Sequence, residues 1–417
     1  MRIVRLTTKV ENALLAGRLQ RDTEAERIAA RIVNDVRRRG DSALFAWTKR
    51  LDATDLRRQG AWVTQRELRA ARDRVGRDFI SAIRHASRNI RRVAQSQMPK
   101  SSTVKVETGV TIEQIVRPIE TIGCYIPGGR YALISTLLMT VIPAQVAGVK
   151  RIVVVCPRPN HQLLAAAAMH GVTEIARIGG AQAIAALAYG TRSVSRVEKI
   201  FGPGNRFVTA AKQLVSADCA IDLPAGPTEA MILATRGNAR WIAADLLAQA
   251  EHAPDAGSFL VTTSAKLAKD VHREISSQLA GLQRDNPAHE STARKGAILI
   301  ATSINAAINF VNRFAPEHLT LNGDARQQLD NISAAGTIFL GEWSAQPIGD
   351  YASGSNHVLP TGGWARRRGG LSALDFVKCI NVQTIERKGF TRVGPVATAL
   401  ARAEGLLAHE AAITVRQ

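Results

Sequence analysis

The feature that most limits the possible folds is an alternation of short apolar runs and helical segments between residues 124 and 340. The run Ile152–Cys156 is continuously apolar and is followed by Pro157, which is typical of a strand buried on both faces of a sheet. A segment with helical spacing follows at residues 160–170, and the same succession recurs along the chain. Because parallel strands are joined by crossover helices, the sequence predicts an α/β fold with parallel sheets.

The alternation occurs in two series that meet near residues 224–228, and a chain of 417 residues is long enough for more than one compact unit. Further strands are expected at residues 174–178, 199–201, 230–234, 259–262, 297–301, 319–321 and 337–340. Residues 20–95 show helical spacing, and residues 103–122 resemble short strands. Beyond residue 371 we expect a helix, a strand and a long final helix over 393–409, a segment too short to form its own core.

Composition argues against several classes of protein. No run of 18 or more apolar residues occurs, and Met1–Arg21 lacks the continuous apolar core of a signal peptide. We therefore expect a cytoplasmic location and no membrane partner. The four cysteines are far apart and include no C-x-x-C pair, so reduced thiols are expected.

The formal net charge of +20 raises the possibility of a polyanion-binding protein. The basic clusters are dispersed, however, at residues 37–39, 57–58, 91–92 and 366–368. Neither a zinc-finger spacing nor an RNP-like aromatic run accompanies them. We interpret the charge as a solvated basic surface and do not expect nucleic acid as a partner. Tight, salt-sensitive nucleic-acid binding is the result that would favour the alternative class.

Two pairs of residues are candidates for chemistry. Gln249 and His252 lie three positions apart at the expected end of a helix, so both side chains can face one metal ion; the alternative is a surface polar pair. Glu317 and His318 precede a predicted strand, and an adjacent carboxylate and imidazole can share proton transfer. An ordinary loop pair is the alternative for these two residues.

Three further residues are weaker candidates by themselves. Asp350 and His357 occur in a polar segment after a predicted strand, for which the alternative is a surface turn. His409 is near the end of the expected final helix, where a histidine also stabilises the helix dipole. Two glycine turns, Gly179–Gly180 and Gly202–Gly204, each join a strand to a helix N-terminus, where phosphate is attracted. Neither turn fits G-x-G-x-x-G, so the standard dinucleotide fingerprint is absent.

Taken together, these segments resemble the histidinol dehydrogenase family. The matching stretches, in the family's order, are Tyr125–Gly129, Gly179–Ala188, Ile200–Asn205, Leu223–Glu229, Gln249–His252, Pro316–Leu319, Gly349–Pro360 and Leu407–His409. They extend from about residue 120 to the end, and the first 120 residues match more loosely. Several long motifs in register make a more specific signal than any one of them.

The resemblance implies two incomplete Rossmann-like parallel-sheet domains with an N-terminal arm and a C-terminal helical tail. We expect residues 1–19 to form the arm and residues 121–229 to form an NAD-binding domain. The other α/β domain is expected to be discontinuous, comprising residues 20–120 plus 230–371, and to carry the catalytic residues. Residues 372–417 would complete the site of the partner subunit in a homodimer.

The resemblance also implies roles for individual residues. One zinc ion per subunit would be bound by Gln249, His252, Asp350 and His409. The matches to NAD-binding positions are Tyr125, Gln182 and Asn205. The family's substrate-binding positions correspond to Thr228, Gln249, His252, Glu317, Asp350, His357, Glu404 and His409. Thr228 keeps the hydroxyl of the serine that often occupies this position in the family.

The implied reaction oxidises L-histidinol to L-histidinal and then to L-histidine, the last steps of histidine biosynthesis, with two NAD. Such an enzyme is an NAD-dependent oxidoreductase acting on a CH–OH group. Zinc would orient the imidazole and amine of the substrate. His318 would accept the alcohol proton, and Glu317 would activate water for attack on the aldehyde. A related dehydrogenase acting on another small alcohol is the closest alternative, against which His357 and Glu404 argue.

Overall fold

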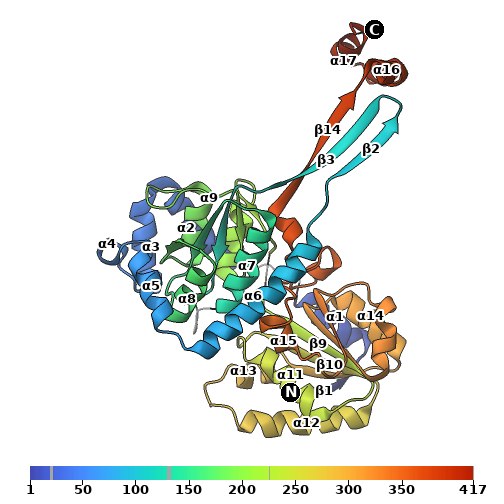
Figure 1. Ribbon diagram of the computed structural model, residues 1–417. Helices are drawn as coiled ribbons and strands as arrows, with labels where there is room; N and C mark the ends of the chain where they lie inside the picture. The colour runs from blue at the N-terminus through green and yellow to red at the C-terminus, as the bar shows by residue number, and fades with distance from the viewer. Residues whose placement is uncertain (19–21, 129–132, 225, 417) are drawn as a thin grey trace.

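The computed structural model describes residues 1–18, 22–128, 133–224 and 226–416. Two parallel sheets, each flanked by helices, form the body of the molecule, and an antiparallel arm projects from it (Figure 1). The predicted boundary between residues 19 and 20 lies outside the described residues, as do Gly129 and Ala225 of the family motifs. Within the described ranges, no helix is both long and apolar enough to cross a membrane.

The first sheet contains six parallel strands in the order β1-β11-β10-β9-β12-β13. Its strands are β1 (Arg2–Arg5), β9 (Glu229–Ala234), β10 (Gly257–Thr262), β11 (Ala297–Ile300), β12 (His318–Asn322) and β13 (Thr337–Leu340). Its helices are α1 (Thr8–Ala16), α11 (Ala239–Ala250), α12 (Ala265–Ala280), α13 (Ala288–Arg294), α14 (Ile304–Phe314) and α15 (Gln346–Tyr351), with the 3-10 helix η1 (Gly323–Asn331). The prediction of an N-terminal arm is wrong, because β1 is an edge strand of this sheet and α1 contacts α14.

The second sheet contains five parallel strands in the order β6-β5-β4-β7-β8. They are β4 (Thr121–Tyr125), β5 (Arg151–Val155), β6 (Glu174–Ala176), β7 (Lys199–Phe201) and β8 (Ala220–Ile221), joined by α7 (Ile134–Ala147), α8 (His161–Met169), α9 (Gly180–Tyr189) and α10 (Arg206–Val215). In chain order this arrangement is 3-2-1-4-5, and β9–β13 repeat it in the first sheet. It lacks only the sixth strand of the Rossmann order, so the predicted incomplete Rossmann-like fold is confirmed.

The N-terminal helices cover the second sheet. They are α2 (Thr23–Arg39), α3 (Asp41–Asp52), α4 (Leu56–Gln59), α5 (Gln65–Asp73) and α6 (Arg77–Gln97). Helix α2 contacts α9 and α10, α5 contacts α8, and α6 contacts α7. Ile90 shares a core with Val154, and Val36 shares another with Val155, so these helices bury both faces of this sheet. The predicted grouping of residues 20–120 with residues 230–371 is therefore wrong for the helices of residues 23–97.

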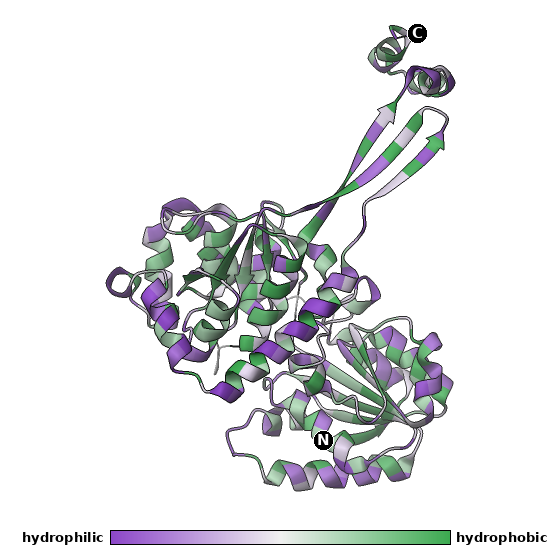
Figure 2. Ribbon diagram, viewed as in Figure 1, coloured by the Kyte–Doolittle hydropathy of each residue, from purple (hydrophilic) through white to green (hydrophobic). Residues whose placement is uncertain are grey.

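The arm consists of β2 (Ser102–Glu107), β3 (Val110–Pro118) and β14 (Val377–Ile385), which pair antiparallel. The 3-10 helices η2 (Trp364–Arg366) and η3 (Ala373–Phe376) precede β14 in the chain, and α16 (Arg387–Ala403) and α17 (Leu407–Thr414) lie at the tip of the arm (Figure 1). The predicted continuous helix over 393–409 is wrong, because Gly405 has a φ of 74° that ends the first helix. Hydrophobic segments alternate along the arm strands (Figure 2), and Val104, Val106, Ile380 and Val382 are exposed.

Candidate functional site

The candidate residues meet at the amino-terminal edge of the first sheet, between the neighbouring strands β9 and β12. Glu229 begins β9 and His318 begins β12, which is where the strand order changes direction. Helix α11 runs back from β9, so Gln249 and His252 at its end reach the same edge. Asp350 comes from α15, which contacts α11. Ligands of open α/β sheets usually bind at carboxyl ends, so this site uses the opposite edge.

This edge lies close to the second sheet. His357 Nε2 is 3.4 Å from Thr136 Oγ1, near the start of α7. Helix α7 follows β4, so Thr136 belongs to the carboxyl-terminal edge of the second sheet. The amino-terminal edge of one sheet and the carboxyl-terminal edge of the other therefore border a common region.

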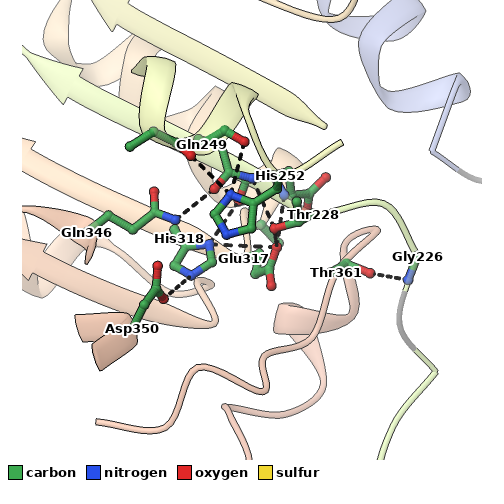
Figure 3. A network of polar contacts seen from close by, with 12 residues as sticks. Gly226, Thr228, Gln249, His252, Glu317, His318, Gln346, Asp350 and Thr361 are labelled. Carbon is green, nitrogen blue, oxygen red and sulfur yellow. Dashed lines mark hydrogen bonds and ion pairs between the residues drawn. The ribbon is translucent and has the colours of Figure 1, made fainter. Parts of the chain in front are cut away.

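Glu317 is held by two donors and is buried. Thr228 Oγ1 donates to Glu317 Oε2 at 2.6 Å, and the Glu229 backbone N–H donates to the same oxygen at 2.9 Å. Gln249 Nε2 donates in turn to Thr228 Oγ1 at 3.0 Å (Figure 3). Burial raises the pKa of Glu317 above its usual value, although His318 and the two donors oppose this shift. A buried, basic carboxylate fixed in this way can act in proton transfer.

His318 is buried and has one free ring nitrogen. Nδ1 lies 3.3 Å from the Glu229 carbonyl, which can only accept, so Nδ1 carries the proton in the neutral ring. Nε2 is buried without a hydrogen-bond partner and lies 3.7 Å from Asp350 Oδ1. Burial opposes the charged form, but Glu317 and Asp350 outweigh it and raise the pKa of His318. Nε2 is thus available as a proton acceptor.

The remaining polar side chains suit a metal ion. His252 Nδ1 lies 3.1 Å from the Ala248 carbonyl oxygen, which leaves Nε2 for a metal ion. Metal-binding histidines usually donate their other ring N–H to a carbonyl or carboxylate in this way. Gln346 Nε2 donates to Gln249 Oε1 at 2.7 Å and orients this oxygen. The pKa of Asp350 is lowered, because His318, His357 and His252 outweigh the effect of burial. Figure 3 shows these side chains gathered from α11, β12 and α15.

The predicted four-ligand set is not assembled within one chain. His409 is the third residue of α17 at the tip of the arm, away from α11 and α15 (Figure 1). Glu404 follows α16 in the same region. The described residues contain no group of three or more His, Cys, Asp or Glu side chains able to hold a metal. The dipole interpretation of His409 is wrong, since this residue lies at the start of a helix and not at its end.

The predicted NAD-binding residues lie at the carboxyl-terminal edge of the second sheet. Tyr125 ends β4, and its hydroxyl accepts from the Gly180 backbone N–H at 3.1 Å, while burial raises the pKa of Tyr125. Gln182 is buried in α9 and donates to Asp52 Oδ2 at 3.0 Å. Asn205 is the N-cap of α10 and accepts from two backbone N–H groups at 3.1 Å. These contacts give the three residues structural roles whether or not they bind a cofactor.

Sequence reasoning missed three residues that support the site: Gln346, Arg18 and Glu229. Arg18 forms an ion pair with Glu229, whose side chain is only 8% exposed. Burial raises the pKa of Glu229 to about 7, with a smaller contribution from Glu317, although Arg18 opposes both. Arg18 and Gln346 could not be found from the sequence, because neither belongs to a recognisable sequence motif. Glu229 was part of a family motif but had no assigned role.

Arg18→Met is expected to destabilise the protein, and more strongly as pH rises. A buried carboxylate left without its partner costs about 3–5 kcal/mol when charged. The folded-state pKa of Glu229 already exceeds its unfolded value and would rise further, so stability is lost as pH increases through the folded pKa. Thermal unfolding of both proteins after chelator treatment measures this effect. The stability that Arg18→Met loses relative to the wild type should be larger at about pH 8 than at about pH 6. Adding Glu229→Gln should recover much of the loss; equal losses at both pH values would contradict this account.

The fold and the site define an α/β enzyme with a buried carboxylate–imidazole pair next to potential metal ligands. The histidinol dehydrogenase family model matches residues 16–417. The chain is 42% identical over 423 aligned positions to histidinol dehydrogenase of Legionella pneumophila (strain Lens), covering 99% of this chain and 97% of that protein. It is 45% identical to the Methanothermobacter thermautotrophicus enzyme of the same name, over 91% of this chain and 90% of that protein.

A solved structure gives the same result. The crystal structure of histidinol dehydrogenase from Elizabethkingia anophelis has a TM-score of 0.92 at 37% identity, covering 100% of this chain and 98% of that chain. The chain therefore belongs to the histidinol dehydrogenase family and is an oxidoreductase. The resemblance stated from the sequence motifs is confirmed.

Proposed function

We propose that this enzyme catalyses the zinc- and NAD-dependent oxidation of L-histidinol through L-histidinal to L-histidine, in the cytoplasm. The observation that carries the proposal is the buried His318, whose free Nε2 lies beside Asp350 while Glu317 lies on its other side. This arrangement places a proton acceptor, a second base and a potential metal ligand next to one another. An alcohol oxidation followed by hydration and a second oxidation can use all three.

The zinc ion would be held by Gln249, His252 and Asp350 of one subunit and by His409 of a second copy of the chain. The donor set is chemically suitable: an amide oxygen, an imidazole nitrogen and an ionised carboxylate are all zinc ligands or close analogues of them. Bound zinc would orient the imidazole and amine of the substrate, and bound NAD would accept a hydride in each oxidation. Thr228, His357 and Glu404 would contact the substrate.

The protein residues divide the proton transfers. In the first oxidation His318 Nε2 accepts the hydroxyl proton of L-histidinol while hydride leaves its carbon. Glu317 then takes a proton from water, and the water oxygen adds to the aldehyde carbon. The hydrate loses a second hydride and a proton to give the carboxylic acid. The raised pKa of Glu317 makes its carboxylate a stronger base for the water step.

NAD would bind at the carboxyl-terminal edge of the second sheet, through Tyr125, Gln182 and Asn205. In support, the N-termini of α9 and α10 both lie at this edge, and helix N-termini attract phosphate. Gly202 has a φ of 110°, and an added Cβ would meet the Tyr125 carbonyl oxygen, so only glycine fits this turn. The common region between the sheets then lies within reach of both cofactor and catalytic residues.

A homodimer with exchanged tails would complete the site. The fully described helix α17 has no buried residue, and Leu407 is 73% exposed. Exposed Val396 and Leu400 on α16 add apolar surface to the same tip. Isolated monomers rarely expose contiguous apolar surface of this kind, so a second copy is the expected cover.

The test is a turnover assay with the purified, zinc-loaded enzyme, L-histidinol and NAD. About two NADH and one L-histidine should form per L-histidinol, since each oxidation delivers one hydride. A chelator should abolish turnover, and added zinc should restore it. No turnover of L-histidinol together with oxidation of another small alcohol would overturn the substrate assignment. Turnover that survives complete zinc removal would overturn the metal assignment.

A further inference from the structure

A second candidate binding site lies on the outer surface formed by α5, α6 and the end of α8. It is an open depression of about 540 Å³, which is within the usual size range of small-molecule sites. Its lining residues are Arg72, Arg84, Ser87, Arg88, Arg91, Arg92, Gln95, Ala168, Met169 and His170. We call it the α6 arginine depression. Purple segments mark the outer face of α6 in Figure 2.

Four of its arginines share one face of α6. They are Arg84, Arg88, Arg91 and Arg92. Residues three or four positions apart lie on the same side of a helix, so these four side chains project in similar directions. Like charges at this spacing repel one another. No acidic residue lines the depression. Among the described residues, none forms an ion pair with any of the five arginines of the depression. Five guanidinium groups are therefore left facing one concave surface.

A second basic depression differs from it in this respect. That depression is lined by Arg31, Asp35, Arg38, Arg39, Ala46, Trp47 and Arg50. There Asp35 forms an ion pair with Arg39 at 2.6 Å and also accepts from Trp47 Nε1 at 2.8 Å. Its own carboxylate thus neutralises part of that cluster, whereas the α6 arginine depression has no such internal counter-charge.

The floor of the α6 arginine depression is fixed by hydrogen bonds. The buried Ser87 Oγ lies 2.9 Å from His170 Nε2, and Gln145 Nε2 donates to the His170 carbonyl at 2.6 Å. Arg91 Nη2 donates to Gln145 Oε1 at 3.3 Å, so one guanidinium is already oriented. A preorganised floor surrounded by arginines that have no acidic partner suits a ligand that accepts many hydrogen bonds.

This depression is separate from the proposed NAD site. His170 follows α8 and precedes β6, so it belongs to the amino-terminal edge of the second sheet. Tyr125 and the turns at Gly179–Gly180 and Gly202–Gly204 follow strands of the same sheet and lie at its carboxyl-terminal edge. A dinucleotide bound at that edge does not account for the arginines.

We propose that the α6 arginine depression binds a small polyphosphate, a ligand with two or more linked phosphate groups. Guanidinium groups form paired, charge-assisted hydrogen bonds with phosphate oxygens, and several linked phosphates match several arginines. The volume favours a compact ligand over a polymer, and Met169 and Ala168 provide only a small apolar wall. The site is independent of the proposed oxidation and of its cofactors.

Isothermal titration calorimetry with inorganic tripolyphosphate tests this proposal on the full-length protein. Arg84→Gln/Arg88→Gln should weaken binding about tenfold or more, since each charge-assisted hydrogen bond contributes substantially. The matched control is Arg57→Gln/Arg58→Gln, which removes the same charge from the exposed helix α4. The control should bind within about twofold of the wild type. Any heat from zinc chelation by tripolyphosphate is common to all three proteins.

Other ligands and the variant controls decide the outcome. Orthophosphate should bind much more weakly than tripolyphosphate, and ATP should resemble tripolyphosphate if only the phosphates are recognised. Equal weakening in both double variants would show a diffuse charge effect and overturn the proposal. A single-stranded oligonucleotide that binds far more tightly than tripolyphosphate would also overturn it, in favour of a nucleic-acid surface. Unchanged thermal unfolding and L-histidinol turnover in Arg84→Gln/Arg88→Gln would show that the fold is intact.

Discussion

His318→Asn is expected to reduce kcat for L-histidinol oxidation by about 10²–10⁴-fold, the usual contribution of a general base, while zinc content stays near that of the wild type. His318 Nε2 is buried and has no hydrogen-bond partner, so it is free to accept the hydroxyl proton. Asparagine fills similar space but cannot take up a proton at neutral pH. Because His318 is not among the proposed zinc ligands, metal binding should survive.

The measurement is steady-state NADH formation together with zinc analysis of the same samples. His272→Asn, on helix α12, which contributes no residue to the proposed site, is the matched control and should keep normal turnover. L-histidinal as starting substrate separates the two oxidations, because Glu317 is proposed to activate water for the second. His318→Asn should therefore slow L-histidinol oxidation more than L-histidinal oxidation. Normal turnover with full zinc content would remove His318 from the mechanism.

The α/β class was predictable because it depends on local periodicity. Apolar runs such as Ile152–Cys156 indicate buried parallel strands wherever they occur, and β5 lies at Arg151–Val155. The partner of each helix was not predictable in the same way. An amphipathic helix such as α2 shows which of its faces is buried but not which sheet covers it. For this reason the N-terminal helices were grouped with the wrong sheet.

In the candidate site, too, residues that form a local sequence pattern were predictable, and residues that act through tertiary contacts were not. The pair Glu317 and His318 could be found because the two residues are adjacent in sequence and precede a strand. Gln346 and Arg18 could not, because each acts through one tertiary contact, with Gln249 and Glu229 respectively. The family motifs link the separate pairs to one another, because they occur together and in a fixed order along the chain. Motifs cannot identify a supporting residue whose role arises only from folding.

Mixing two inactive variants is expected to restore activity if the tails are exchanged between subunits. His318→Asn lacks the proposed base, and His409→Ala lacks the proposed fourth zinc ligand, so each homodimer should have two defective sites. In a mixed dimer one site combines the intact His318 of one chain with the intact His409 of the other. Random pairing of equal amounts should then give about a quarter of wild-type activity, provided that the subunits exchange.

Recovered activity in the mixture would occur only if the tails are exchanged between subunits. The arm carries α17 away from α11 and α15, so His409 does not join Gln249, His252 and Asp350 within one described chain (Figure 1). If each site used its own chain's His409, every site in the mixture would contain one of the two defects and activity would stay at the level of the separate variants. Co-expression of differently tagged chains, followed by tandem purification, isolates the mixed dimer. Activity in that fraction, with zinc at about half the wild-type content, is expected because only one site has its full ligand set.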